Sequence, residues 1–239
     1  MLWLLTCVTT GVLAAIALFI LHISRVPTAA QPTALTLSQG TTSAAHRVSA
    51  KHASRPAVTR PQLTDVTSGL SYRLLSSPWR SGCPSDLITP EFNWSAGENA
   101  VAGHVTISGS VVDWHGVACS GELQQQFAYA RPADLKPTTM NLLNAIGPAY
   151  YSGVPHSRTV EKNSAMRVSG HQAWIVKFRM DYRHGASHGL TWRTELGAVV
   201  VVDRGTTGAP AVFYVSVPGN LGTQKVTTLV KSLRLSSQS

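Results

Sequence analysis

The amino-acid sequence predicts an α+β fold in which helices cover an antiparallel sheet. Apolar and polar side chains alternate along residues 172–183, which is the pattern of a half-buried strand. Towards the C-terminus, residues 221–235 carry their apolar side chains at helical spacing instead. A strand-rich chain with two covering helices is typical of an α+β sandwich.

The chain has 239 residues, a formal net charge of +9 and only 13% charged residues. That charged fraction is about half of the usual value for soluble domains. The cations are scattered singly, and no recognised nucleic-acid-binding motif accompanies them. We therefore expect no nucleic-acid partner, and we favour an envelope protein, an anionic cell-wall polymer or anionic lipid.

The first segment, residues 1–23, contains no Asp, Glu, Lys or Arg. As a helix it would span a hydrocarbon layer of about 30 Å. The alternative is a cleaved signal peptide with Thr28-Ala29-Ala30 as its cleavage site, but the apolar run is longer than usual and no basic segment precedes it. The sequence thus predicts a single-pass transmembrane helix that holds the protein at the cell membrane.

Residues 24–68 form a linker rich in Ala, Pro, Thr, Ser and Arg, without an aromatic residue or a cysteine. Such a segment cannot bury enough apolar surface to offset its chain entropy, so we predict that it is disordered. One globular α+β domain, residues 69–239, is predicted to follow it.

Two cysteines of the predicted domain, Cys83 and Cys119, bear on its location. An even pair in an exported domain predicts a disulfide, and two buried thiols are the alternative. Arg25 is the only Lys or Arg close behind the transmembrane helix, and the positive-inside rule makes it a weak argument for a cytoplasmic domain. We give more weight to the cysteines and expect the domain to be extracytoplasmic.

Within the domain, strands are predicted around residues 70–74, 104–109 and 111–119, and a helix over residues 137–146. Gly147-Pro148 predicts the end of that helix. Two apolar runs, residues 199–202 and 211–217, predict a central hairpin buried on both faces. The last helix would direct four residues towards the sheet: Val226, Leu229, Val230 and Leu233.

A second hairpin is predicted from residues 172–183 and 190–196, and its charges suggest a register. The favoured register pairs Asp181 with Arg193. It also pairs Arg179 with Glu195, whose side chain would then face solvent. Cross-strand pairs of opposite charge stabilise a sheet by about 0.2–1 kcal/mol each.

His184 and His188 lie in the connection between these two strands, four residues apart, as two metal ligands on a helix would be. The favoured register instead leaves Gly185 to Gly189 as a five-residue loop without helical geometry. No Cys, Asp or Glu nearby completes a set of metal ligands. We therefore predict a hairpin loop here, and no metal or other cofactor.

No catalytic motif is evident, because the chain has no Gly-x-Ser-x-Gly turn, no phosphate-binding glycine loop and no persuasive pair of carboxylates. The sequence therefore predicts a non-enzymatic, membrane-tethered binding or accessory domain. A cell-envelope enzyme, hydrolytic or metal-assisted, is the alternative. Trp79 and Arg80, beside a proline, are candidate residues of a binding surface, as are Trp94 and Trp114, with packing in the core as the alternative.

Three segments carry a resemblance to a known family: GLSYRLLSSPW, QAWIVKFRMDY and AVFYVSVPGNLGTQKVTTLVKSLRL. They resemble the start, middle and end of actinobacterial single-pass membrane proteins of uncharacterised function. Their layout over residues 69–239 is similar to the Mog1/PsbP-like α/β/α sandwich. The resemblance implies that fold and, because its members mostly act as accessory or binding modules, a role of that kind.

Overall fold

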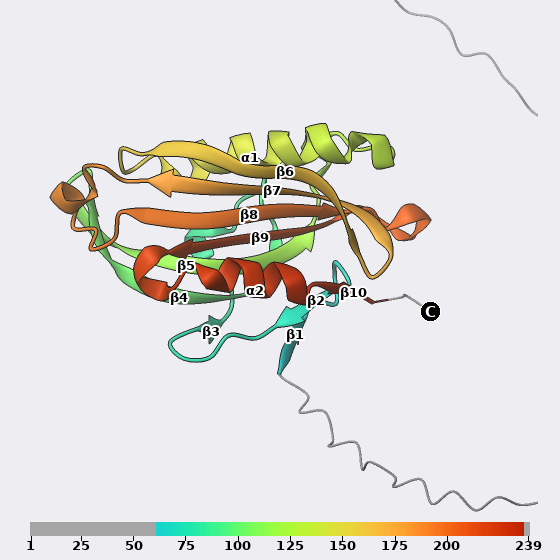
Figure 1. The fold of residues 1–239 in the computed structure, drawn as a ribbon, viewed down its shortest axis with the longest axis horizontal. Coiled ribbons are helices and arrows are strands. Elements are labelled where there is room, and N and C mark those ends of the chain that lie inside the picture. The colour runs from blue at the N-terminus through green and yellow to red at the C-terminus, as the bar shows by residue number, and fades with distance from the viewer. Residues whose placement is uncertain (1–60, 237–239) are drawn as a thin grey trace, which may run out of the picture. The chain divides into compact units, whose positions relative to one another are not determined.

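The computed structural model describes residues 61–236 of the chain (Figure 1). The predicted transmembrane helix, residues 1–23, and most of the predicted linker lie outside the described residues. Between residues 61 and 236, no helix combines the length and the hydropathy needed to cross a membrane.

The main sheet has seven antiparallel strands in the order β3-β4-β5-β9-β8-β7-β6. Consecutive strands pair except β5 and β6, which α1 connects, and β9 also pairs with β5, which joins the two halves of the sheet. The strands are β3 (Arg80–Ser81), β4 (Trp94–Ile107), β5 (Ser110–Glu122), β6 (Ser157–Val168), β7 (His171–Asp181), β8 (Thr194–Val202) and β9 (Ala211–Pro218).

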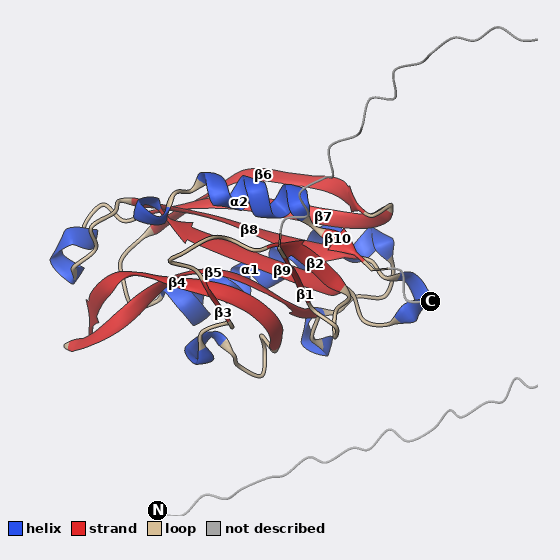
Figure 2. Ribbon diagram, turned by 90° about the horizontal axis from the view of Figure 1, so that it is seen from below, coloured by secondary structure: helices blue, strands red, loops and turns tan. Residues whose placement is uncertain are grey.

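Helices cover both faces of this sheet (Figure 1 and Figure 2). Helix α1 (Leu135–Tyr151) packs on one face, called the α1 face. Helix α2 (Gln224–Ser232) packs on the opposite face, the α2 face, beside a small sheet. That small sheet consists of β1 (Gln62–Thr64), β2 (Leu70–Arg73) and β10 (Arg234–Leu235). The predicted antiparallel sheet with two covering helices is thus confirmed.

Burial follows from position in the sheet. Strand β9 lies at the centre and is buried along its whole length. Its successive side chains point to opposite faces and pack in different cores, with Tyr214 on the α1 face and Phe213 on the α2 face. A strand covered on both sides needs apolar residues at every position, which is why the sequence shows a continuous apolar run here. The central hairpin predicted from residues 199–202 and 211–217 is confirmed.

The first helix is longer than predicted. It continues through Gly147-Pro148 to Tyr151, so the predicted end was wrong. A proline inside a helix removes one backbone hydrogen bond. Here the guanidinium of Arg158, from β6, donates to the backbone carbonyl of Leu143 and to Oδ1 of Asn144, both at 2.8 Å. These contacts and the burial of Tyr151 stabilise the last turns from outside the helix.

The register of β7 on β8 also differs from the prediction. Arg179 lies opposite Leu196, and Met180 lies opposite Glu195, which is a shift of one residue. Because side chains alternate between faces, this shift turns Glu195 from solvent into the α1-face core, where it is 1% exposed. Burial of the apolar residues of β8 in the two cores stabilises the sheet by more than two surface ion pairs would.

The connection between β7 and β8 was predicted to lack helical structure, and this was wrong. Gly185–His188 forms one turn of 3-10 helix, and the backbone N–H of Tyr182 donates to the carbonyl of Arg193 at 2.8 Å. The loop is therefore longer than the five residues expected from the charge pattern. The hairpin itself is confirmed.

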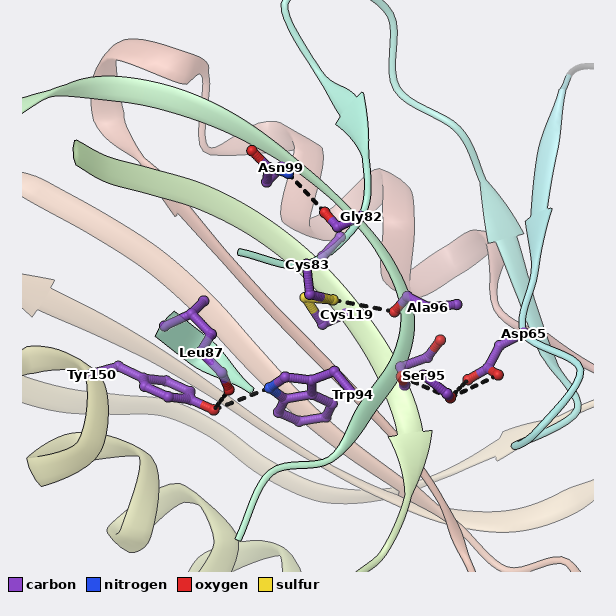
Figure 3. Close-up of a disulfide and its surroundings, with 12 residues drawn as sticks. Asp65, Gly82, Cys83, Leu87, Trp94, Ser95, Ala96, Asn99, Cys119 and Tyr150 are labelled. Carbon is purple, nitrogen blue, oxygen red and sulfur yellow. Dashed lines mark hydrogen bonds between the residues drawn. A yellow bond between two sulfur atoms is a disulfide. The ribbon is translucent and has the colours of Figure 1, made fainter. Parts of the chain in front are cut away.

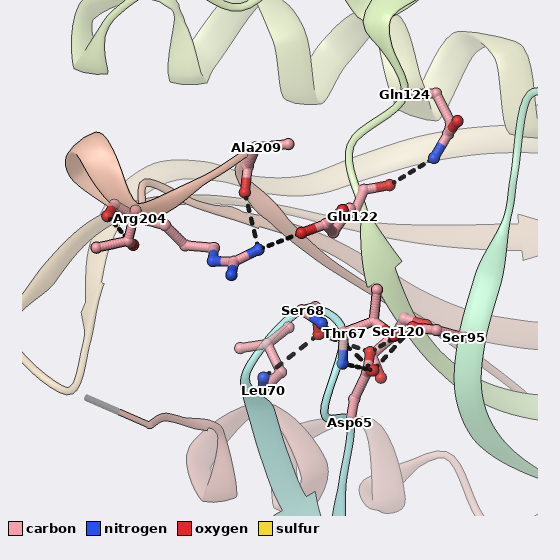
Figure 4. A network of polar contacts seen from close by, with 11 residues as sticks. Asp65, Thr67, Ser68, Leu70, Ser95, Ser120, Glu122, Gln124, Arg204 and Ala209 are labelled. Atoms are coloured by element: carbon pink, nitrogen blue, oxygen red, sulfur yellow. Dashed lines mark hydrogen bonds and ion pairs between the residues drawn. The ribbon is translucent and has the colours of Figure 1, made fainter. Parts of the chain in front are cut away.

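The fold includes residues 61–68, which were predicted as part of the linker. One contribution comes from Asp65, whose carboxylate accepts hydrogen bonds from the hydroxyls of Ser68 at 2.6 Å and Ser95 at 2.8 Å (Figure 4). Burial opposes ionisation of Asp65, but these hydrogen bonds outweigh it and lower the pKa of the carboxyl. Asp65 thus adds to the pairing of β1 with β2 and to the packing of Leu63 on the α2-face core.

We predict that Gly197→Ala destabilises the protein. Gly197 lies opposite Phe178, and a Cβ at this position would be 2.2 Å from Cζ of the phenyl ring. Relieving this overlap should reduce the free energy of unfolding by about 1–3 kcal/mol, measurable by urea denaturation. In a Phe178→Ala background the same substitution should cost much less. An equal cost in both backgrounds would show that the ring is not the reason.

Candidate functional site

A cavity of about 110 Å³ lies on the α1 face, between the end of α1 and the beginning of β5. Tyr150 and Tyr151 of α1 form one side, and Trp114 of β5 forms another. Glu195 of β8 and Ser216 of β9 lie at its base, deep in the sheet. Its mouth is bordered by the loop that includes Asp86 and Leu87 and by the β4–β5 hairpin.

Glu195 is the centre of a buried polar network at the base of this cavity. One carboxylate oxygen, Oε2, accepts from Nε1 of Trp114 at 3.0 Å and from the hydroxyl of Tyr182 at 3.1 Å. The other, Oε1, accepts from the hydroxyls of Tyr151, at 3.0 Å, and Ser216. These four donors come from β5, α1, β9 and the segment after β7, so the network connects most of the α1 face.

Burial changes the protonation of this network. Removal from water raises the pKa of the Glu195 carboxyl, although its four hydrogen bonds act in the opposite direction. Burial and the nearby Glu195 likewise raise the pKa of the Tyr151 and Tyr182 hydroxyls. The phenols therefore stay protonated and act as donors at neutral pH.

The geometry of Glu195 is that of a structural acid. A general acid or base must reach the proton that it transfers to or from the substrate. A carboxylate has about four acceptor positions, and protein donors already use that number on Glu195. This arrangement holds Tyr151, Trp114 and Ser216 in place around the cavity and leaves the carboxylate little capacity for a ligand.

One side of the mouth is formed by residues 82–93, called the disulfide loop. Cys83 is bonded to Cys119 of β5, with 6.0 Å between the Cα atoms, which confirms the predicted disulfide (Figure 3). The hydroxyl of Tyr150 donates to the backbone carbonyl of Leu87 at 2.7 Å. The amide of Asn99 donates to the carbonyl of Gly82 at 2.7 Å. The loop is thus held to the sheet by a covalent bond and to α1 by a hydrogen bond.

Gly97 of β4 lies directly beneath the disulfide. A Cβ at this position would be 2.2 Å from Sγ of Cys83 and 3.0 Å from Sγ of Cys119. Only glycine leaves room for the disulfide to pass over this strand.

The residues that the sequence suggested for a binding surface have different positions. Trp94 and Trp114 are both buried on the α1 face, and Trp114 lines the cavity. Trp79 is only 7% exposed and belongs to the α2-face core, so packing accounts for it. Arg80, the first residue of β3, is exposed. The structure does not bring Trp79 or Arg80 to the cavity, and of these two only Arg80 has an exposed side chain.

The histidines of the β7–β8 connection are not part of the cavity. Nδ1 of His188 lies 3.1 Å from the backbone carbonyl of Thr106, which fastens the connection to β4. Within residues 61–236, no group of three or more His, Cys, Asp and Glu side chains is arranged to hold a metal ion.

A second hollow, of about 350 Å³, contains the residue types of a hydrolase: His156, Ser157 and Asp181. Their contacts differ from those of a catalytic triad, in which a carboxylate orients the histidine. Nδ1 of His156 lies 2.8 Å from the backbone carbonyl of Val154. No side-chain hydrogen bond joins His156 to Ser157 or Asp181 in the described part of the chain.

Sequence reasoning missed the cavity because its central residue was assigned to the wrong face. Tyr150, Tyr151 and Ser216 carry no motif, and α1 was predicted to end before the two tyrosines. The available signal was Glu195 itself, an acid followed within a few residues by a long apolar run. Reading that run as one strand would have placed Glu195 at the edge of the core.

No protein-family model matches the chain, and no curated protein does. Among solved structures, it is similar to the cyanobacterial PsbP (CyanoP) of Synechocystis sp. PCC 6803, with 12% identity, a TM-score of 0.46, and coverage of 74% of this chain and 92% of that one. It is also similar to the Ran-binding protein Mog1p of Saccharomyces cerevisiae, with 7% identity, a TM-score of 0.36, and coverage of 74% and 95%.

These two proteins bear the names of the Mog1/PsbP-like fold that the sequence resemblance implies. Identities at this level concern the arrangement of the chain and not its ligands. The resemblance to actinobacterial single-pass membrane proteins stays a prediction.

We predict that loss of the disulfide weakens the fold substantially. The bond closes a loop with a sequence separation of 36 residues, and the entropy of such a closure is equivalent to about 4 kcal/mol. A Cys83→Ala/Cys119→Ala variant should lose roughly this amount in urea denaturation. Reductant should bring the wild type close to the variant and leave the variant unchanged. If reductant left the free energy of unfolding of the wild type unchanged, the prediction would be contradicted.

We also predict a pH dependence caused by Glu195. Its folded-state pKa lies above its ordinary value of 4.5, so its stabilising effect is fully present below that pH and is lost as pH rises through the folded pKa. Glu195→Gln resembles the protonated carboxyl and removes the titration. The free energy of unfolding of the wild type, minus that of the variant, should therefore fall with rising pH by at most about 1.4 kcal/mol per pH unit.

Urea denaturation of both chains across the pH range tests this. Glu98, whose pKa burial also raises, is present in both chains and cancels in the difference. A difference that is flat, or that rises with pH, would be the contrary result.

Proposed function

We propose that the chain is a membrane-tethered, extracytoplasmic binding domain without enzymatic activity, and that it engages an envelope protein at the α1-face cavity. The observation that carries the proposal is the disulfide loop, a covalently fixed border beside a cavity with a polar base. The apolar segment of residues 1–23, read from the sequence, would be the tether.

The disulfide supports the extracytoplasmic location. Structural disulfides persist in oxidising compartments and are rare in the cytosol, where thiols are kept reduced. Cys119 is fully buried beside the cavity, and Gly97 provides the space that the bond requires. Because Gly97 of β4 leaves the space that the disulfide occupies, the bond is built into the fold. This supports maturation of the protein outside the cytoplasm.

The geometry of the cavity supports binding over catalysis. Glu195, the most deeply buried acid of the site, already accepts four hydrogen bonds from the protein. The disulfide and the contact between Tyr150 and Leu87 fix the mouth before any partner arrives. Such preorganisation reduces the entropy lost on binding.

The size of the cavity favours a protein partner. At about 110 Å³ it is well below the roughly 300–1,000 Å³ of pockets that enclose small-molecule ligands. It is better matched to one inserted side chain. Val112, 39% exposed, lies at the mouth, and Ile88, 45% exposed, follows Leu87 in the disulfide loop. Asp86 and Asp113 also border the mouth and would repel an anionic wall polymer.

The location is tested by labelling an introduced cysteine in intact cells. Thr206 is exposed in the connection between β8 and β9, so Thr206→Cys, in a Cys7→Ala background, should react with a membrane-impermeant maleimide. The same background without the new cysteine should stay unlabelled unless reductant is added, because Cys83 and Cys119 are bonded. Labelling of Thr206→Cys only after cell lysis would place the domain on the cytoplasmic side.

The use of the cavity is tested by photo-crosslinking. A photoreactive amino acid at position 112 should capture an envelope protein in intact cells, and the same amino acid at position 206 should not. Releasing the disulfide loop in the Cys83→Ala/Cys119→Ala variant should reduce the capture at 112. Equal capture at both positions, or equal capture with and without the disulfide, would count against the cavity as the binding site.

A further inference from the structure

Three lysines from three elements come together on the α2 face. Helix α2 packs against β2, β8 and β9, so the part of this face formed by β6 and β7 is not covered by a helix (Figure 1). Lys162 of β6 lies directly opposite Lys177 of β7. Nζ of Lys177 lies 3.4 Å from the hydroxyl of Thr227 on α2, and Lys231 is one helical turn beyond Thr227. We call these three residues the lysine cluster: Lys162, Lys177 and Lys231.

The lysine cluster is unfavourable for the isolated fold. Like charges directly opposite each other destabilise a sheet. Partial burial and the ammonium groups of Lys162 and Lys231 together lower the pKa of Lys177, against the opposing effect of Glu161. No salt bridge connects any of the three lysines with a carboxylate in residues 61–236. A cluster that the fold does not neutralise is suited to an anion from outside.

Nearby acids do not neutralise the α2 face. Asp65 and Glu98 are each only 1% exposed. Glu161 pairs with Arg179 at 3.7 Å, and Glu122 pairs with the buried guanidinium of Arg204 at 2.6 Å (Figure 4). Asp181, the one acidic residue of β7, lies at the far end of that strand. Three further cations belong to α2 and the strands of the small sheet beside it: Arg73, Lys225 and Arg234.

The N-terminal part of the chain joins the domain on this same face. Residue 61 leads directly into β1, which pairs with β2, and β2 packs against α2. If residues 1–23 cross the membrane, the α2 face is the side of the domain from which the tether departs. A basic face beside the tether is well placed to meet the lipid surface.

We propose that the α2 face docks, through Lys162, Lys177 and Lys231, on the anionic phospholipid headgroups of the membrane that holds the chain. The inference rests on the membrane tether of the proposed function, but not on the cavity. Each ammonium group would donate hydrogen bonds to headgroup phosphate oxygens. Basic residues at an anionic surface bind additively and salt-dependently, so docking weakens as ionic strength rises. The cavity on the opposite face would then point away from the lipid.

The experiment uses the full chain in lipid nanodiscs. A fluorophore is attached to Gln224→Cys, on α2, or to Asn141→Cys, on the exposed side of α1, both in a Cys7→Ala background. Discs contain phosphatidylcholine alone or mixed with phosphatidylglycerol, and a nitroxide on the lipid headgroup quenches nearby fluorophores. We expect quenching of the α2 label only, in anionic discs only, and its loss at high salt.

Charge variants assign the effect to the lysine cluster. Lys162→Gln/Lys177→Gln/Lys231→Gln should abolish the quenching. A control variant that removes the same charge from exposed residues elsewhere, Lys136→Gln/Arg183→Gln/Arg193→Gln, should retain it. Equal quenching of both labels, quenching in neutral discs, or equal loss in both triple variants would overturn the inference.

A failure of the tether can be distinguished from a failure of the surface. If the chain does not enter nanodiscs, its partition onto phosphatidylglycerol vesicles is measured by sedimentation, and the lysine variant should bind roughly a hundredfold more weakly. In that case the tether is wrong, and only the binding of the lysine cluster to anionic headgroups is supported. If the lysines bind a soluble phosphate polymer and neither lipid preparation, the occupant is a polymer and the inference is wrong.

Discussion

The burial of one carboxyl group constrains the whole α1 face. Glu195 is removed from water inside a sheet, where an unsatisfied acid would be costly, so the surrounding elements must each direct a donor towards it. Trp114 comes from β5, Tyr151 from the last turn of α1 and Ser216 from β9. The extension of α1 past Pro148 and the one-residue register of β7 on β8 both serve this arrangement, because without them the donors and the acid would not meet.

The disulfide loop adds a second constraint at the edge of the same face. Cys83 is covalently joined to β5, and Tyr150 links Leu87 to α1, so the loop is attached to the two elements that also hold the Glu195 network. Tyr150 and Tyr151 are neighbours in the chain, yet one stabilises the mouth of the cavity and the other its base. The mouth and the base of the cavity are therefore held by the same two elements, β5 and α1.

The main sheet separates two surfaces of different character. The α1 face has a cavity with an acidic border and apolar residues at its mouth, whereas the lysines of the α2 face have no acidic partner among residues 61–236. Tethering and partner recognition can coexist in one domain if they use opposite faces. The N-terminal connection through β1 lies on the basic face, which is consistent with this division.

Local patterns in the sequence were sufficient to predict those elements in which a single interaction, burial of one or both faces, dominates. The alternation in β7, the continuous apolar run of β9 and the apolar stripe of α2 are set by which face is buried, and each was predicted correctly. Where two small effects compete, only the tertiary structure shows which of them prevails. Surface ion pairs favoured a register that would expose Glu195, but burial of the whole strand outweighs them. Likewise, Asp65 draws linker-like residues into the fold through serine hydroxyls that are distant in sequence or unmarked by any motif.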